Sequence, residues 1–253
     1  MPQQLELLTA LRPYIVDGPF RDPPSPGLRY RLENPNFELA EAAILSAMLR
    51  HLRPQRIVEI GSGYSSAVIL DTNDLALGGA ANCTFIDPFP GLLTSLLRPG
   101  DAESVDILPL PVQDVDVGRF SSLETGDVLF VDSSHVVKVG SDVNHIVFEL
   151  LPALAAGVHV HFHDVRYPFE YPYEWVEEGR AWNEAYLLRA FLQFNRAFRV
   201  VLYPSYLALH HTEAIAGRMP AFMRNPGSSL WIARAACDSG SGLATPRELQ
   251  CET

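Results

Sequence analysis

The sequence has few cysteines, little basic charge and no long apolar run, and each shortage excludes a class of protein. Its three cysteines, Cys83, Cys237 and Cys251, are too scattered for a disulfide framework or a zinc site. Lys and Arg number 19 against 30 Asp and Glu, giving a formal net charge of −11. This balance argues against a nucleic-acid partner, because backbone phosphates need a basic face. No apolar run approaches the roughly 20 residues of a membrane helix.

What remains is the composition of a globular enzyme. The chain has 253 residues, of which 47% are hydrophobic and 19% charged, which suits one α/β domain with additions. Its first residues lack the basic and apolar regions of a signal peptide. We therefore expect a cytoplasmic protein with no membrane partner.

Three parts can be distinguished along the chain. Residues 1–36 are expected to form a cap, with a helix over residues 2–16 that Pro13 ends, followed by an extended segment rich in Pro and Gly. Residues 37–235 carry the main domain. Residues 236–253 are rich in Ser, Gly and Thr and are expected to form a flexible tail.

The main domain alternates between strand and helix patterns. Strands are predicted near residues 56–60, 83–87, 105–110, 127–132, 157–163, 198–203 and 229–234, and helices over 37–52, 65–71, 90–98, 141–155 and 183–196. This alternation predicts a doubly wound, seven-stranded and mostly parallel sheet that binds ligands at the strand carboxyl ends. Because no convincing helix separates the last two strands, we expect them to form an antiparallel C-terminal hairpin.

The most informative stretch is RIVEIGSGYSS, residues 56–66, which predicts a buried strand, a glycine turn and a helix start. Gly61 and Gly63 have no Cβ, so we expect a ligand to lie against the main chain there. Asp87 ends the second strand, where a carboxylate can accept the hydroxyl protons of an adenosine ribose. The turn lacks the third glycine of the dinucleotide fingerprint, which argues against NAD.

Polar side chains also follow the fourth and fifth strands. Asp132 and His135 end the fourth, and His163 and Asp164 end the fifth. Because these strands are neighbours in a doubly wound sheet, the four side chains should converge, offering three ligands for a cation and a spare imidazole. An imidazole suits zinc, iron or manganese better than magnesium. Either such a metal is held, or His163 is a general base with an ordinary pKa of about 6.5 and no metal is present.

Two of these motifs resemble a known family. Strand, Glu-x-Gly-x-Gly and helix resemble the cofactor loop of the class I S-adenosylmethionine (SAM)-dependent methyltransferases. Asp-x-x-His with an acid-bearing pair on the next strand resembles the cation-dependent sugar and macrolide O-methyltransferases and the cephalosporin-hydroxylase-like proteins. The resemblance implies SAM as cofactor, bound by Glu59, Gly61, Ser62, Gly63, Tyr64, Ser65, Ser66, Asp87, Asp114 and Asp132.

The same resemblance implies roles for the converging residues. Asp132 and Asp164 correspond to the ligands of a divalent metal (Mg, Mn, Fe or Zn), and His135 corresponds to the general base. In those relatives the acid-bearing pair is Glu-Asp or Asp-Asp. In this chain the pair is His163-Asp164. We therefore predict Asp132, His163 and Asp164 as metal ligands, and His135, His163 and Asp164 as catalytic residues.

An aromatic and proline-rich segment follows the fifth strand. We predict that it forms a rigid lid over a small-molecule acceptor, with Tyr167, Tyr171, Trp175 and Trp182 as substrate-binding residues. The alternative is an aromatic cluster that closes the domain edge or a homodimer surface.

These observations lead to one predicted function and two rivals. The predicted function is SAM-dependent O-methylation of a hydroxyl on a small polar or natural-product acceptor, as in natural-product biosynthesis. One rival is a catalytically silent SAM-binding or scaffold subunit. The other is metal-dependent chemistry without methyl transfer on the same fold.

Overall fold

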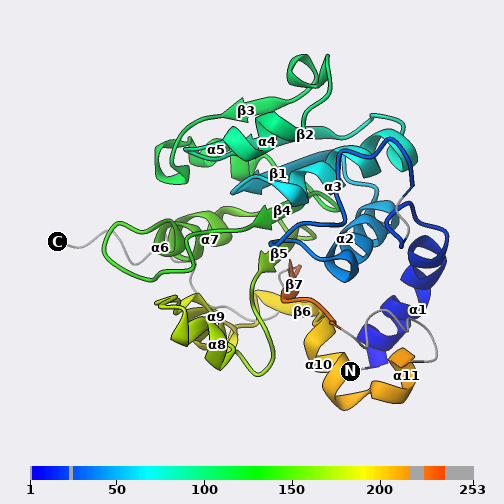
Figure 1. Cartoon of the computed structure of the whole chain (residues 1–253). Coiled ribbons are helices and arrows are strands. Elements are labelled where there is room, and N and C mark those ends of the chain that lie inside the picture. The colour runs from blue at the N-terminus through cyan, green and yellow to red at the C-terminus, as the bar shows by residue number, and fades with distance from the viewer. Residues whose placement is uncertain (1, 23–24, 217–224, 237–253) are drawn as a thin grey trace.

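A seven-stranded sheet forms the centre of the molecule, in a computed structural model that describes residues 2–22, 25–216 and 225–236 (Figure 1). Its strands are β1 Arg56–Ile60, β2 Asn82–Ile86, β3 Asp106–Leu108, β4 Val128–Val131, β5 His159–His163, β6 Phe198–Leu202 and β7 Ser229–Arg234. They are ordered β3-β2-β1-β4-β5-β7-β6. The first five run parallel, while β7 pairs antiparallel with β5 and β6. The predicted doubly wound sheet with an antiparallel hairpin is therefore confirmed.

Helices cover both faces of this sheet (Figure 1). One face carries α1 Pro2–Val16, α2 Leu39–Leu52, α3 Tyr64–Thr72, α4 Gly91–Leu96, α10 Pro204–His210 and α11 Thr212–Ala216. The other carries α5 Val117–Ser121, α6 Asp142–His145, α7 Leu151–Ala153 and α9 Glu184–Leu192, and α8 Tyr173–Glu177 lies outside them. Each face buries its own apolar cluster, because alternate strand residues point to opposite sides.

Shorter turns complete the helical elements. They are the π-helical η1 Asn73–Leu77 and η4 Ile146–Leu150, and the 3-10 turns η2 Asp101–Glu103 and η3 Val112–Asp114. The predicted helix over residues 141–155 is therefore a continuous path of α6, η4 and α7. Among the described residues, no helix is long and apolar enough to span a membrane.

Two local predictions are wrong. Pro13 does not end α1, which continues to Val16, because Leu8 and Leu11 are buried and α1 packs along α2. The strands β6 and β7 are antiparallel, but α10 and α11 separate them in the chain. The short apolar pattern of α10, which buries Leu207, gave no clear helical period. The predicted tail lies almost wholly outside the described residues.

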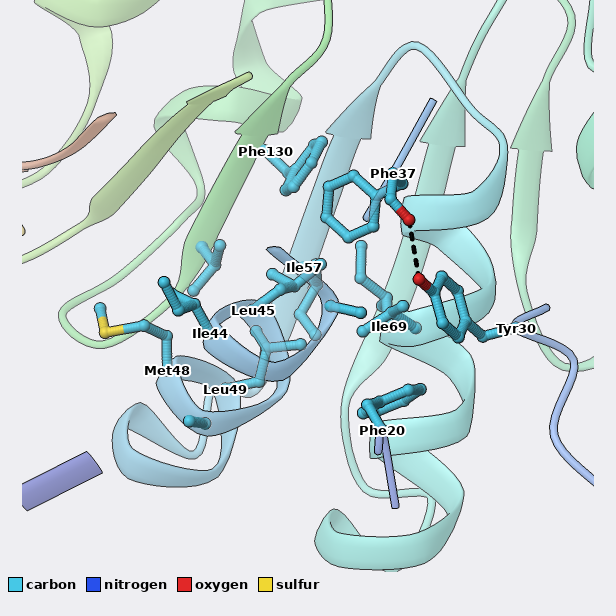
Figure 2. Packing of buried hydrophobic residues seen from close by; sticks show 14 of the residues in the cluster. Phe20, Tyr30, Phe37, Ile44, Leu45, Met48, Leu49, Ile57, Ile69 and Phe130 are labelled. Carbon is cyan, nitrogen blue, oxygen red and sulfur yellow. Dashed lines mark hydrogen bonds between the residues drawn. The ribbon is translucent and has the colours of Figure 1, made fainter. Parts of the chain in front are cut away.

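The segment before α2 packs into the core. Figure 2 shows Tyr30 beside Ile69 of α3 and Phe37 near Phe130, with the Tyr30 hydroxyl donating to the Phe37 carbonyl at 2.7 Å. The Phe37 ring contacts Phe130 of β4 and His163 of β5, at centroid distances of 6.1 and 5.3 Å. The segment therefore reaches the carboxyl ends of the strands that the sequence indicated as functional.

Candidate active site

The glycine turn after β1 is shaped by the neighbouring strand. Gly61 has φ +80°, and a Cβ there would lie 2.0 Å from the carbonyl oxygen of Asp132. Because β1 and β4 pair, Asp132 donates its N–H to the Ile60 carbonyl at 2.8 Å, which fixes this close approach. The β1–β4 contact thus by itself accounts for the glycine at position 61, and the expectation that a ligand lies against the main chain there stays a prediction.

Glu59 supports the turn from below. Its side chain is fully buried and accepts the hydroxyl hydrogens of Ser65 and Ser66. Ser66 Oγ in turn accepts the N–H of Gly63 at 2.9 Å. Burial raises the pKa of Glu59 to about 8, against the two serine hydrogen bonds. Glu59 is therefore mostly protonated near neutral pH, and Asp132 is left as the negative group that faces the turn.

A cavity of about 520 Å³ opens where the first four strands of the sheet end at their carboxyl side. Ser62 donates both its N–H and its hydroxyl to Asp87, at 2.9 and 2.7 Å. The residues that line this cavity include Gly61, Ser62, Asp87, Gln113, Asp132, Ser133, Ser134 and Lys138. Five predicted cofactor residues do not line it: Glu59, Gly63, Tyr64, Ser65 and Ser66.

Asp114 is also outside this cavity. It is exposed at the end of η3, and its neighbour Gln113 lines the cavity instead. Gln113 donates Nε2–H to the Gly140 carbonyl at 3.0 Å, which ties the loop after β3 to the loop after β4. The sequence placed the right loop at the site, but a 3-10 turn decides which of its side chains points inward.

The four polar residues at the ends of β4 and β5 do converge. His135 Nε2 lies 3.3 Å from Asp132 Oδ1 and 3.8 Å from Asp164 Oδ2. His163 Nε2 lies 3.6 Å from Asp164 Oδ1. His135 and Asp164 have φ of 58° and 55°, the left-handed region that costs energy for non-glycine residues and is concentrated at functional sites.

The sequence did not assign a role to Glu184, which completes this cluster. Its fully buried carboxylate lies 2.8 Å from His135 Nδ1 and accepts the Ser133 hydroxyl at 3.0 Å. The first residues of α9 are held in place because Asn183 and Glu184 both donate N–H to the His135 carbonyl, at 2.9 and 3.1 Å. No local pattern could have indicated this contact, since 49 residues separate the two side chains.

The surroundings of the two histidines change their protonation. Burial lowers the pKa of His135, but the hydrogen bonds to Asp132 and Glu184 outweigh it and raise the pKa to about 10. Burial also opposes the charge of His163, and the carboxylates of Asp164 and Asp132 raise its pKa to about 9. Both imidazoles are therefore cationic at neutral pH in the ligand-free protein, in place of the ordinary pKa that the sequence suggested.

The predicted metal ligands do not form a metal centre in this arrangement. Each carboxylate of Asp132 and Asp164 faces an imidazole. Within residues 2–22, 25–216 and 225–236, no group of three or more His, Cys, Asp or Glu side chains is placed to hold a metal ion. The metal at Asp132, His163 and Asp164 stays a prediction, and we derive no step of the reaction through it.

Asp132, His135, His163 and Asp164 together form what we call the acid–imidazole cluster. A second cavity, of about 610 Å³, is lined by this cluster. Trp175 and Trp182 line it, and the Trp182 ring lies 4.3 Å from the His135 ring. Tyr167 packs against Tyr206 instead, and the Tyr171 hydroxyl accepts the Ala185 N–H. The aromatic segment thus places two of its four predicted side chains at this cavity.

The segment before α2 supplies another wall of the second cavity. Pro35, Asn36, Glu38 and Glu41 line it. Glu41 is buried and accepts the N–H groups of Glu38 and Ser228, at 3.0 and 2.8 Å, so it joins the start of α2 to the start of β7. Glu41 stands at the third helical position, a capping-box position that a sequence can indicate, but nothing local relates it to a site.

Comparison with known proteins supports the family suggested by the motifs. Residues 58–165 match a family model described as a methyltransferase domain. An uncharacterized protein of Archaeoglobus fulgidus is 35% identical over 126 residues, which are 48% of this chain and 56% of that protein. The chain thus spans about half the length of the curated relative it matches.

Solved structures resemble the fold. The SAH-bound methyltransferase PaMTH1 of Podospora anserina aligns with a TM-score of 0.52 and 15% identity, over 91% of this chain and 88% of that one. The SAM complex of the O-methyltransferase TomG from Streptomyces achromogenes, involved in tomaymycin synthesis, aligns with a TM-score of 0.49 and 15% identity, over 91% and 90%. Residues 58–165 thus match a methyltransferase domain, and the strand order agrees with the Rossmann-like fold of the solved methyltransferase structures.

Proposed function

We propose that the protein transfers the methyl group of SAM to a hydroxyl oxygen of a small polar molecule. The observation that carries this proposal is that the two cavities share one wall, formed by Asp132, Ser133 and Ser134. A cofactor in the first cavity and an acceptor in the second would meet there. The rate enhancement would come chiefly from holding the two reactants in line.

Each group at this meeting point has a chemical role in the proposal. Asp87, with its half-buried carboxylate at the end of β2, would accept the ribose hydroxyl protons. The Asp132 carboxylate would face the positive sulfonium, and its pKa is kept below the ordinary value by His163 and His135 despite burial. The sulfonium carries the methyl group as a cation, and transfer leaves a neutral sulfur.

The acceptor proton would pass to His135. Glu184 fixes Nδ1 of this ring, so that Nε2 is the nitrogen that faces Asp132 and Asp164. A base with its pKa raised to about 10 must first lose its own proton. The rate should therefore rise with pH well above the ordinary histidine range, which replaces the expectation of a midpoint near 6.5.

The experiment that tests the proposal has two steps. SAM affinity is measured by calorimetry with and without EDTA, and release of S-adenosylhomocysteine is then followed across a library of hydroxyl acceptors. Acceptor-dependent release supports the proposal. SAM binding without release from any acceptor favours a silent binding subunit, and absence of SAM binding overturns methyl transfer.

The EDTA arm tests the predicted metal separately. Lower turnover with unchanged SAM affinity would support a metal at Asp132, His163 and Asp164. Full turnover in EDTA would contradict it and leave the imidazoles as the acid–base groups.

A further inference from the structure

Two arginines line the second cavity and bring more hydrogen-bond donors than their protein partners use. Arg166 follows Asp164 by two residues, and Arg180 follows α8. Among the described residues, the Arg166 side chain has no hydrogen bond or ion pair, and Arg180 uses only Nε, which donates to Glu178 at 2.9 Å. A guanidinium carries five N–H donors, so both side chains have donors left for a ligand.

The Arg180 guanidinium also lies over two aromatic rings. Its guanidinium carbon lies 4.8 Å from the ring of Trp175 and 4.8 Å from the ring of Trp182. The two indoles contact each other edge to face, at a centroid distance of 5.3 Å. Contact with two aromatic rings restricts a guanidinium, so it loses less freedom when it binds a planar anion.

The carboxylates of the same cavity, in contrast, already have partners. Glu41 accepts two backbone N–H groups, and Glu38 accepts the side-chain amide of Asn225 at 2.6 Å. Asp132 and Asp164 face the imidazoles of His135 and His163, as described above. Unmatched donors of this cavity therefore include two cationic side chains, which a neutral polyol cannot satisfy as well as an anion.

We propose that the acceptor carries an anionic group, a carboxylate or a phosphate, which Arg166 and Arg180 bind while its hydroxyl lies at the acid–imidazole cluster. This inference rests on the proposed function for the hydroxyl, but the anion site stands on its own geometry. The guanidinium fork matches both anions, because each offers two oxygens to parallel N–H groups. Trp182 contacts both Arg180 and His135, so the anion site and the acid–imidazole cluster are neighbours in one cavity, which one small molecule could span.

The test is a tryptophan fluorescence titration of the full chain, since two of its three tryptophans, Trp175 and Trp182, line the cavity. The probes are two matched pairs that do not absorb at the excitation wavelength, gluconate against gluconamide and glucose 6-phosphate against glucose, at constant ionic strength. We expect at least one anion to bind about tenfold or more tightly than its neutral partner. A preference for gluconate over gluconamide indicates a carboxylate site, and a preference for glucose 6-phosphate over glucose indicates a phosphate site.

Variants locate the site. Arg166→Gln and Arg180→Gln should each remove the preference for the anion, while Arg199→Gln, on the exposed edge strand β6, should keep it. The proposal is overturned if neither anion binds, if the neutral partners bind equally well, or if both cavity variants keep the wild-type preference. SAM affinity is measured in every variant: a wild type that binds no SAM overturns the proposed function and leaves the result on the anion site intact.

Discussion

At the scale of single residues, the contact between Glu184 and His135 has the largest chemical consequence. A histidine at the end of a strand would ordinarily titrate near 6.5. Here a buried carboxylate on one ring nitrogen and Asp132 on the other hold the imidazole as a cation. The His135 imidazole therefore carries a proton at neutral pH, and its acid–base behaviour depends on Glu184 of α9.

The raised pKa of His135 predicts that the free energy of unfolding depends on pH. The folded-state pKa of His135, about 10, is above its ordinary value of 6.5, so its contribution is full below pH 6.5 and is lost as pH rises through 10. The free energy of unfolding of the ligand-free protein, from urea titrations, should fall across this window. Glu184→Gln should flatten the fall, whereas Glu149→Gln, an exposed change on η4, should not. An equal slope in wild type and Glu184→Gln would contradict the assignment.

A second prediction at this scale concerns Asp87 and Asp114. Asp87→Ala should weaken SAM binding by about 1.5–3 kcal/mol, the contribution of a hydrogen bond to a charged group. Asp114→Ala is the matched control, because this exposed carboxylate lies one residue beyond the cavity-lining Gln113. Calorimetry should find its SAM affinity close to wild type. Equal losses in the two variants would restore Asp114 as a cofactor residue.

At the scale of elements, the close contact of β1 with β4 controls the glycine turn. A side chain at position 61 would meet backbone, which cannot swing away as a flexible side chain can. The backbone there also has a positive φ, which β-branched residues rarely adopt.

Gly61→Val should therefore destabilise the fold, by about 3 kcal/mol or more, as well as abolish SAM binding. Gly78→Ala is the control, since Gly78 also has a positive φ but no atom lies within 4 Å of its added Cβ. Gly78→Ala should lower the free energy of unfolding by about 1–2 kcal/mol, which is the cost of the positive φ alone. A Gly61→Val protein as stable as wild type, with only SAM binding lost, would show that the missing Cβ serves the ligand after all.

At the scale of the whole molecule, one buried cation joins the first 36 residues to the sheet domain. Arg29 is buried and pairs with Asp71 at 3.0 Å, Asp74 at 2.8 Å and Asp101 at 2.6 Å. Asp71 also accepts the N–H groups of Arg29 and Tyr30. The hydrogen bond and charge of Arg29 keep the pKa of Asp101 below its ordinary value. This cluster positions the segment whose end forms a wall of the second cavity.

Removing Arg29 takes away the one buried cation of this cluster and leaves buried Asp71 with only the partly exposed Arg98, at 3.2 Å. Arg29→Met is expected to cost about 3–5 kcal/mol of unfolding free energy, the range for breaking a buried ion pair. Arg119→Met removes the partly exposed pair with Asp106 and should change stability by about 1 kcal/mol or less. Urea titrations compare the two, and similar small losses in both would mean that the apolar contacts of Tyr30 and Phe37 hold the segment.

Much of this molecule can be predicted from the chain. The alternation of strand and helix patterns indicated all seven strands, and the parallel strands β4 and β5 bring their terminal polar residues together, as with His135 and Asp164. These are consequences of local periodicity and of the parallel order, which act at short range along the chain. The glycine turn after β1 is also a local feature of the sequence, because Gly61 and Gly63 already indicate it.

Only the tertiary structure decided the contacts that tune the site. Glu184 reaches His135, Glu41 joins α2 to β7, and Gln113 replaces Asp114 at the cavity, because packing of distant elements places these side chains. The protonation of His135 follows from burial and from two carboxylates: the Asp-x-x-His spacing indicated Asp132, but nothing in composition or spacing indicated Glu184. The sequence by itself indicated which strand ends bring the acidic and imidazole side chains together. The fold determined which groups surround them, since burial and charge are properties of the assembled molecule.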